Sequence, residues 1–502
     1  MSTINTNVQS LLAQRILGQQ NKALRQSLER LSTGLQINRG GDNPAGLIAS
    51  EALRSEKASI SAAIGNAERA DQVINIAEGG LQEINSLLIE VQSLVGQSAN
   101  EAGMSEDERR ANQLQIDSIL QTIDRIAGTT SFQGSKLLNG TLDFTISAQT
   151  SQVADFQINA AKLAADSNRN VQLTVTESAQ HAGLFLSTAG ATILLDDSPD
   201  SRLVLEVGGT LGSREFTIAS ATTTADVAAQ INEFSNALGV TVAASGGGLA
   251  FKSTGFGSDA FVAIDVVDDG GSAGGIARLA SDDENTAIAT GFTTLTAAAN
   301  SEAIRDSGQN VGAIINGVAA TSRGRTARIN TDFLDVEITL NTSGAQSLGT
   351  LDAFTITGGG AVFNLGPNVD ISNQVSIGVR NVATRNLGNV ANGFLNQLAS
   401  GRSNNVFDGD LNTAQKIVND SINQLSGLRG RLGAFQKNTI GATIRSLGVA
   451  LENTSAAESA IRDTDFATET AELTRAQILV NAATQVLGIA NAQPQSVLAL
   501  LG

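Results

Sequence analysis

The spacing of apolar residues changes twice along this chain, from helical near the start to strand-like in the middle and back to helical near the end. Leu17, Leu24 and Leu31 repeat every seven residues, and Leu28 and Leu35 fill the complementary heptad position. A heptad of this kind predicts a coiled-coil seam. Residues 1–40 hold no second seam, so its partner must lie further along the chain or in another chain.

A long rod is predicted after the first seam. Asn43 followed by Pro44 is a natural N-cap and first helical residue. Apolar residues then recur in steps of three and four from Ile60 to Val95, which as a helix would span roughly 50 Å. Ser105 and Glu108 form a capping box, which predicts the start of a third helix.

The middle of the chain has the composition and spacing of short strands. Asn139-Gly140 is a strong hairpin signal. Residues 166–359 are rich in Gly, Ala, Thr, Ser and Asp, and short apolar alternations there are separated by glycine turns. One helical stretch is predicted at Ala225–Phe234, with Thr224 as its cap. These features favour small α+β modules.

Helical spacing returns near Asp410 and continues through Val418–Leu451. Ser455 with Glu458 has the pattern of another capping box, so a new helix is expected there. The chain ends in the apolar run Val497–Gly502. Because exposed apolar ends are unfavourable in water, we expect another chain to cover this end.

These observations predict a mainly α fold with β structure. The long N- and C-terminal helices pair into a coiled-coil rod, and β-rich α+β modules are inserted between them. The expected domains are a terminal helical core of 1–45 with 455–502, a helical rod with a β-hairpin of 46–165 with 360–454, and variable surface modules of 166–359.

Composition excludes several classes of function. The net charge of −17 and the pI of about 4.6 argue against binding nucleic acid or anionic lipid. The chain has no cysteine, so thiolate catalysis and Cys-ligated metals are excluded. The N-terminal segment lacks the pattern of a secretory signal, and no stretch is apolar enough for membrane insertion.

No arrangement of residues predicts an enzyme, a cofactor or a metal site. His181 is the one histidine, and a surface or loop position is expected for it because no His-Glu-x-x-His motif surrounds it. The run Gly246–Gly248 lacks the Lys-Ser/Thr of a phosphate loop. Solvated loops are expected at the three acidic clusters, which lack EF-hand spacing: Asp196-Asp197, Asp268-Asp269 and Asp282-Asp283-Glu284.

Several motifs at both ends, in order, resemble those of bacterial flagellins. They are Ile4–Asn7, Leu28–Leu35, Ile37–Arg39, Asp42–Leu47 and Phe132–Leu138 near the start, and Arg429–Ala434, Asp463–Phe466 and Gln493–Leu498 near the end. The span Val204–Val267 more loosely resembles an insertion module of flagellin exteriors. The resemblance covers roughly residues 1–140 and 405–502.

The resemblance implies a structural subunit that self-assembles into the extracellular filament of the bacterial flagellum for swimming motility. Its terminal helices would line the filament core, and its middle would project outward. The implied partners are other copies of the subunit, an export chaperone, the filament cap and the hook-junction proteins. Export would use the flagellar type III apparatus.

Two sets of residues are candidates for sites. The first is the terminal helix seam, through which assembly is expected: Leu17, Leu24, Leu28, Leu31, Leu35, Leu479, Val486, Val497, Leu498 and Leu501. The second corresponds to the family surface that animal toll-like receptors detect: Ile89, Glu90, Leu94 and Gln115. Glu90 stands where that surface has an arginine and Gln115 where it has a glutamate, so a weakened receptor surface is expected.

Two alternatives share these features. A hook–filament junction protein would have the same terminal helices but form short oligomers. A filament-borne adhesin would bind a ligand through the outer modules.

The two ends carry charges of opposite sign. Residues 1–40 contain five basic residues and one acidic residue, whereas residues 455–502 contain five acidic residues and two basic residues. We expect this difference to set the register in which Arg25 and Arg30 face Glu469 and Glu472, while apolar stripes supply most of the affinity.

Overall fold

A computed structural model describes residues 6–164, 167–188, 190–196, 201–245, 247–279 and 292–499. The chain forms two compact units. The first combines the residues up to Gln72 with Asn364–Asn373 and the residues from Ala434 onward. The second combines Val73–Phe363 with Gln374–Gly433. Mainly helical ends and β-rich modules between them agree with the predicted fold class.

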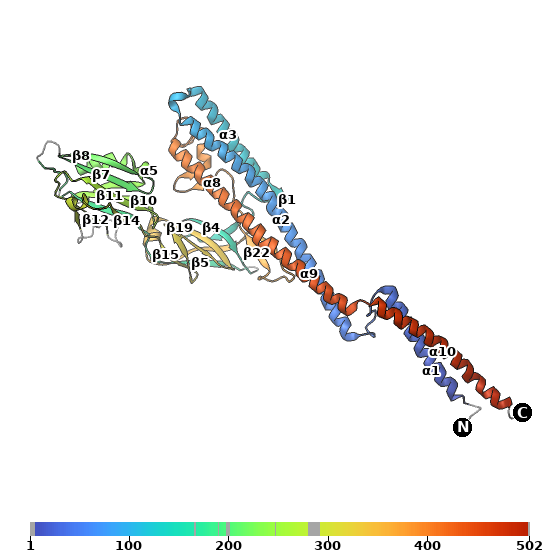
Figure 1. Cartoon of the computed structure of the whole chain (residues 1–502). Coiled ribbons are helices and arrows are strands. Elements are labelled where there is room, and N and C mark those ends of the chain that lie inside the picture. The colour runs from blue at the N-terminus through green and yellow to red at the C-terminus, as the bar shows by residue number, and fades with distance from the viewer. Residues whose placement is uncertain are drawn as a thin grey trace. The chain divides into compact units, whose positions relative to one another are not determined.

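The first unit contains an antiparallel pair of helices, α1 (Val8–Thr33) and α10 (Phe466–Ala499), which lie side by side in Figure 1. The side chain of Asn7 caps the start of α1 by accepting a hydrogen bond from the backbone N–H of Ser10. Gly34 ends the helix at φ 73°, a left-handed conformation that favours glycine.

The break after α1 leads into α2 (Pro44–Ser98), whose residues up to Gln72 belong to the first unit. Asn43 Oδ1 accepts a hydrogen bond from the N–H of Gly46 at 3.0 Å, which confirms the predicted cap. A π-helical turn at Phe435–Ile440 precedes α9 (Gly441–Arg462).

The helix start predicted at Ser455 is wrong, because α9 continues through this position to Arg462 and the break comes at Asp463–Asp465. No glycine or proline interrupts residues 449–462. The carboxylate of Glu458 does not fold back to cap a helix and instead contacts Lys57 Nζ at 3.3 Å. The division into three domains, which relied partly on this start, stays a prediction.

The helical part of the second unit is built from the remainder of α2 with α3 (Glu106–Thr129) and α8 (Leu411–Ala434). The capping box of Ser105 and Glu108 is confirmed. Each helix buries one apolar stripe: Ile74, Leu81, Ile84, Leu88 and Val91 on α2, Ile116, Ile119, Leu120 and Ile123 on α3, and Ile417, Val418, Leu425, Leu428 and Leu432 on α8.

Hydrogen bonds fix these helices and the segment after residue 378 to one another. Gln92 on α2 donates to Asn419 Oδ1 on α8 at 2.7 Å. Asp124 on α3 accepts from the backbone N–H and the hydroxyl of Thr384 at 2.8 and 2.9 Å. This segment contains β23 (Gly388–Asn389), β24 (Gly393–Phe394) and a 3-10 helix at Leu395–Leu398.

The hairpin predicted at Asn139-Gly140 is found earlier in the chain, with its turn at Gln133-Gly134. β1 (Ser131–Phe132) pairs with β2 (Ser135–Lys136), and Gln133 and Gly134 form the turn with φ of 48° and 86°. Two successive positive φ angles match the right-handed twist of a two-residue hairpin. Asn139, by contrast, accepts hydrogen bonds from Thr141 in a local bend and joins no paired strands.

A first β module packs two antiparallel sheets around one core. One sheet has the order β16-β15-β5-β20-β3 and the other β17-β18-β19-β4. The strands are β3 (Phe144–Ser147), β4 (Val153–Ala161), β5 (Arg169–Glu177), β15 (Gly312–Ile315), β16 (Val318–Ala319), β17 (Thr321–Arg323), β18 (Thr326–Asn330), β19 (Leu334–Leu340) and β20 (Gly349–Gly359). A short helix, α7 (Thr342–Gln346), follows β19, and β21 (Ala361–Asn364) pairs with β22 (Gln374–Ile377) after β20.

A second β module is inserted between β5 and β15. Its sheets have the orders β13-β12-β6-β10-β9 and β14-β11-β7-β8. The strands are β6 (His181–Ser187), β7 (Arg202–Gly209), β8 (Ser213–Ala219), β9 (Val240–Ser245), β10 (Gly248–Phe256), β11 (Phe261–Asp268), β12 (Gly275–Arg278), β13 (Thr293–Thr294) and β14 (Ile304–Ser307).

Helices α4 (Thr224–Asn232), α5 (Ser235–Leu238) and α6 (Leu295–Ala298) complete the second module. The predicted helix at Ala225 is present, but Thr223 caps it rather than Thr224. The hydroxyl of Thr223 accepts from the N–H of Asp226, whereas Thr224 Oγ1 donates to the carbonyl of Ala191.

Candidate functional site

The two terminal helices meet along a heptad of small and medium side chains. On α1 the residues turned to α10 are spaced three and four apart, and on α10 the same spacing recurs. The seam positions are Ser10, Ala13, Leu17, Gln20, Leu24, Ser27 and Leu31 on α1, and Glu469, Leu473, Ala476, Val480, Ala483, Leu487 and Ala490 on α10. The leucines and Val480 are half-buried, while the alanines and serines are buried.

Polar contacts at both ends of the pair hold this register. Asn7 donates to the carbonyl of Ala490 at 2.7 Å, and the hydroxyl of Ser10 donates to Asn491 at 2.6 Å. At the other end, the N–H of Thr464 donates to the carbonyl of Gly34 at 2.9 Å. The pair therefore cannot slip by one residue without losing contacts at both ends.

The predicted opposition of charges places one ion pair in the seam. Arg30 Nη1 lies 3.5 Å from the carboxylate of Glu469, and both side chains are mostly buried. The other acidic residue of the expectation, Glu472, instead contacts Arg475 on its own helix at 3.8 Å, where both side chains are exposed. The structure thus brings together one of the expected cross-helix pairs.

A second charge cluster ties α9 to α2 within the first unit. Glu458 lies between Lys57 and Arg54, at 3.3 and 3.8 Å. Arg462 contacts Glu51 at 3.0 Å. A hydrogen bond from Arg54 is the largest cause that lowers the pKa of Glu51; desolvation opposes it, and the charges of Arg54 and Arg462 lower the pKa further.

The predicted seam residues divide into two groups. Leu17, Leu24 and Leu31 lie in the seam, and Leu35 forms a bridge with Asp463 beyond it. Leu28 does not fill the complementary heptad position, because Ser27 lies there and Leu28 is 48% exposed. The packing of α10 against α1 buries Ser27 between the half-buried Leu24 and Leu31 and leaves Leu28 outside the seam.

The remaining predicted seam residues lie on α10 or beyond it. Leu479 is 41% exposed and Val486 is 55% exposed, so neither contributes to the intramolecular seam. Val497 and Leu498 lie in a stretch of α10 where only the backbone is described, and Leu501 lies outside the described residues.

Sequence reasoning missed the second apolar surface that the pair presents. At 100° per residue, Leu479 and Val486 flank the seam of α10, and Ile478 and Ile489 lie on the side of the helix turned away from it, so that all four are exposed. On α1, apolar side chains are exposed outside the seam at Val8, Leu11, Leu12 and Ile16. Counting small residues as seam positions would have separated these two surfaces.

The predicted receptor surface lies on α2 and α3. Ile89 is 52% exposed, but Leu94 is 5% exposed and belongs to the helical core. Gln115 donates a hydrogen bond to the carboxylate of Glu90 at 2.9 Å. The two residues that depart from the family pattern therefore pair with each other.

The residues weighed for chemistry have structural roles where they are described. His181 stacks on Phe256 at 3.7 Å between ring centroids. Asp268 and Asp269 accept hydrogen bonds from the N–H groups of Gly270 and Gly271 in their own turn. Asp282-Asp283-Glu284 and Asp197 lie outside the described residues, and among the described ones no group of three His, Asp or Glu side chains is placed to hold a metal.

The described helices include none long and apolar enough to cross a membrane. The described residues of α1 and α10 form a helix pair whose seam holds the chain's own ends together, and apolar side chains outside the seam are exposed.

Three family models match the chain. The bacterial flagellin N-terminal helical region matches residues 4–143, and the bacterial flagellin C-terminal helical region matches residues 415–501. The flagellin hook IN motif matches residues 202–255, within the second β module. This last match overlaps most of the span Val204–Val267, which resembles an exterior insertion module.

Curated relatives cover nearly the whole chain. It is 31% identical to a flagellin of Salmonella choleraesuis over 528 residues, which span 99% of both chains. It is 27% identical to the B-type flagellin of Pseudomonas aeruginosa over 548 residues, again 99% of both chains. Among solved structures, it is similar to the D2–D3 domains of the flagellar cap protein FliD from Serratia marcescens, at 19% identity and a TM-score of 0.24, over 40% of this chain and 98% of that one.

Matches to both terminal regions, together with full-length relatives of the same name, agree with the paired terminal helices and the inserted modules. The chain belongs to the bacterial flagellin family and is a structural subunit of the flagellar filament.

Proposed function

We propose that the apolar surface of the α1–α10 pair packs against neighbouring copies of the chain and so drives homopolymer formation. The carrying observation is that Ile478, Leu479, Val486 and Ile489 are exposed on α10 outside its seam. Burying an exposed side chain of this size contributes about 1.5–3 kcal/mol. Repeated in every subunit, this term is larger than that of any exposed ion pair.

The test is a double substitution, Leu479→Asp with Val486→Asp, followed by sedimentation of filaments at fixed salt. We expect the pelleted fraction to fall to background. The helix content of the monomer, measured by circular dichroism, should be the same in the variant and the parent. A matched control replaces Val267 and Leu348, which are also exposed but lie in the β modules, with Asp. Normal sedimentation of the α10 variant would contradict the proposal.

The export route and the accessory proteins of the filament are inferred from family membership. We infer export through the flagellar type III apparatus, with a chaperone that guards the apolar ends and a cap under which subunits are added. Secretion to the extracellular filament and contact with the hook-junction proteins belong to the same inference. A deletion of the chaperone gene is expected to leave the chain unstable inside the cell, whereas a deletion of the cap gene is expected to release it into the medium.

Two alternative functions, a hook–filament junction protein and a filament-borne adhesin, predict different experimental outcomes. A hook–filament junction protein would give short oligomers in electron micrographs, whereas a filament subunit gives long filaments. An adhesin would lose surface binding when the second β module is removed, with filament formation retained. The full-length match to curated flagellins favours the filament subunit.

We also propose that toll-like receptor recognition is weak. Glu90 stands where the family pattern has a positive charge and accepts a hydrogen bond from Gln115, and Leu94 is buried, so this surface offers a receptor neither that charge nor that leucine. Glu90→Arg with Gln115→Glu is expected to raise receptor signalling by purified monomer. A control, Glu83→Arg, changes a charge on the same helix without restoring the pattern.

A further inference from the structure

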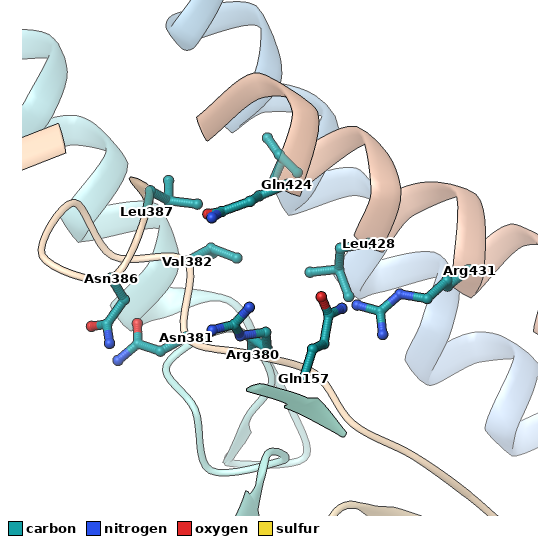
Figure 2. Close-up of a pocket in the computed structure, with 10 residues that line it drawn as sticks. Gln157, Arg380, Asn381, Val382, Asn386, Leu387, Gln424, Leu428 and Arg431 are labelled. Carbon is teal, nitrogen blue, oxygen red and sulfur yellow. The ribbon is translucent and has the colours of Figure 1, made fainter. Parts of the chain in front are cut away.

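A small polar cavity lies where the first β module meets α8. Its volume is about 30 Å³. A water molecule needs about 10–15 Å³ on this measure, so the space fits two waters or one small ion. The wall combines strand β4, the segment after β22 and α8 (Figure 2).

The lining of this cavity is cationic and rich in hydrogen-bond donors. Arg380 and Arg431 are its charged residues, and no carboxylate lines it. The remaining members supply amides and apolar side chains: Gln157, Asn381, Asn386 and Gln424, with Val382, Leu387, Leu425 and Leu428. Figure 2 shows Arg380 and Arg431 on either side of Gln157. The wall therefore carries two positive charges and no negative one.

Arg431 is the more buried of the two cations. With the amide oxygen of Gln157 facing α8, Arg431 donates to it through Nη1 at 2.8 Å and also through Nη2. Among the described residues, no carboxylate lies within 4.0 Å of the Arg431 guanidinium nitrogens. Burial lowers the pKa of Arg431 to about 10, so the group stays charged at neutral pH.

Three acidic side chains outside the lining also act electrostatically on the two arginines: Asp335 and Glu337 on Arg431, and Asp143 on both. Asp335 is held by Arg328 at 3.2 Å on the adjacent strands of the sheet. Asp155 lies 3.6 Å from Arg380 Nη2, but it does not line the cavity, and both side chains are partly exposed. A buried cation bonded to a neutral amide is costly unless a counter-charge is supplied. Two such cations on one wall repel each other and increase that cost.

We propose that this cavity binds a small inorganic anion, of the size of chloride, between Arg380 and Arg431. The guanidinium groups would donate charge-assisted hydrogen bonds to it, which are stronger than those to a neutral amide. Because Arg380 follows β22 and Arg431 is on α8, the anion bridges the first β module and the helical part of the second unit. Phosphate shares this chemistry, but it is too large to enter the cavity fully.

The test uses the full-length monomer in sodium methanesulfonate, titrated with chloride while the ³⁵Cl NMR linewidth is followed. We expect an excess linewidth that saturates, and that bromide displaces at similar concentrations. Displacement by phosphate at lower concentrations than bromide would overturn the assignment to a chloride-sized ion. No excess linewidth in the parent would overturn the proposal.

The variants assign the signal to this cavity. Arg380→Gln, at the more exposed of the two arginines, is expected to remove most of the excess linewidth while circular dichroism stays unchanged. The matched control is Arg429→Gln, two residues from Arg431 on α8, because Arg429 already contacts the carboxylate of Glu78 at 2.8 Å. Equal loss of linewidth in both variants would place the chloride elsewhere and overturn the proposal.

Discussion

In the α1–α10 pair, the buried apolar side chains are alanines, namely Ala13, Ala476, Ala483 and Ala490. The second β module, by contrast, buries Leu184, Leu205, Val207, Phe251 and Ile264 almost completely. An alanine contributes little apolar area, whereas each larger side chain contributes about 1.5–3 kcal/mol when buried. The module is therefore expected to be stable by itself, whereas the helix pair is expected to need contacts with neighbouring subunits.

The largest expected difference between these regions is in protease resistance. Because ordering costs about 1–2 kcal/mol per residue, the ends of the monomer are expected to be largely unfolded. Limited proteolysis of the monomer should remove both terminal segments and leave the β modules intact, whereas filaments should protect the ends. Equal protection of α10 in monomer and filament would show that the pair is stable alone.

A deletion separates the modules from the assembly surface. Strands β3 and β4 precede residue 166 but pair with β20 and β19, so removing 166–359 takes the partners of both strands away. Removing 182–307 instead cuts beside the bridge of Gln180 with Gln309 and leaves the first module whole. We expect the shorter deletion to polymerise normally and the longer one to polymerise poorly, as judged by sedimentation.

Core substitutions compare the two regions directly. Leu205→Ala in β7 removes a fully buried side chain and is expected to cost about 2–5 kcal/mol. Leu24→Ala in the half-buried seam of α1 is expected to cost about 1 kcal/mol or less. Calorimetry of the full-length monomer should show a shifted module transition for the first variant and unchanged transitions for the second.

Charge reversal tests the one ion pair in the seam. Glu469→Lys places a second cation beside Arg30 and should raise the critical concentration for assembly several-fold. Adding Arg30→Glu should restore much of the loss. The control, Glu472→Lys, affects an exposed contact and should change little, as exposed pairs contribute about 0–1 kcal/mol. If Glu469→Lys assembles like the parent, the apolar seam alone sets the register.

The smallest expected effect is a difference in the sign of pH dependence. Hydrogen bonds from Thr468 and from the N–H groups of Ala467 and Thr468 lower the pKa of Asp465. This contribution is present above the unfolded value of about 4 and is lost as pH falls through the folded value. Acid should therefore slightly weaken the terminal unit, seen as a small fall in the sedimented fraction of filaments as pH is lowered.

Burial has the opposite consequence in the second unit, where it raises the pKa of Asp143. A carboxyl group with a raised pKa loses stability as pH rises through the folded value. Asp143→Asn should therefore slightly raise the melting temperature at pH 7 and have no effect near pH 3. A lower melting temperature at pH 7 would show that the ionised carboxylate is needed.

The sequence by itself determined those features that depend on interactions between residues close together in the chain. The Asn43 cap, the capping box of Ser105 and the helical ends depend on residues within a few positions of one another. The order of motifs at both ends was also sufficient to indicate the family. Hydrogen bonds between near neighbours need no distant partner, so a local pattern can predict them. The pattern at Ser455 failed because Glu458 contacts Lys57 on another helix.

Only the tertiary structure decided which face of each helix is covered. The periodicity of α1 contains both Ser27 and Leu28, and only the approach of α10 selects the smaller residue for the seam. The same holds for Leu479 and Val486, which have the hydrophobicity of seam residues but lie beside the seam and are exposed. The hydrophobicity of a side chain indicates that its burial is favourable. Close packing between segments that are distant in the sequence determines which segment buries it.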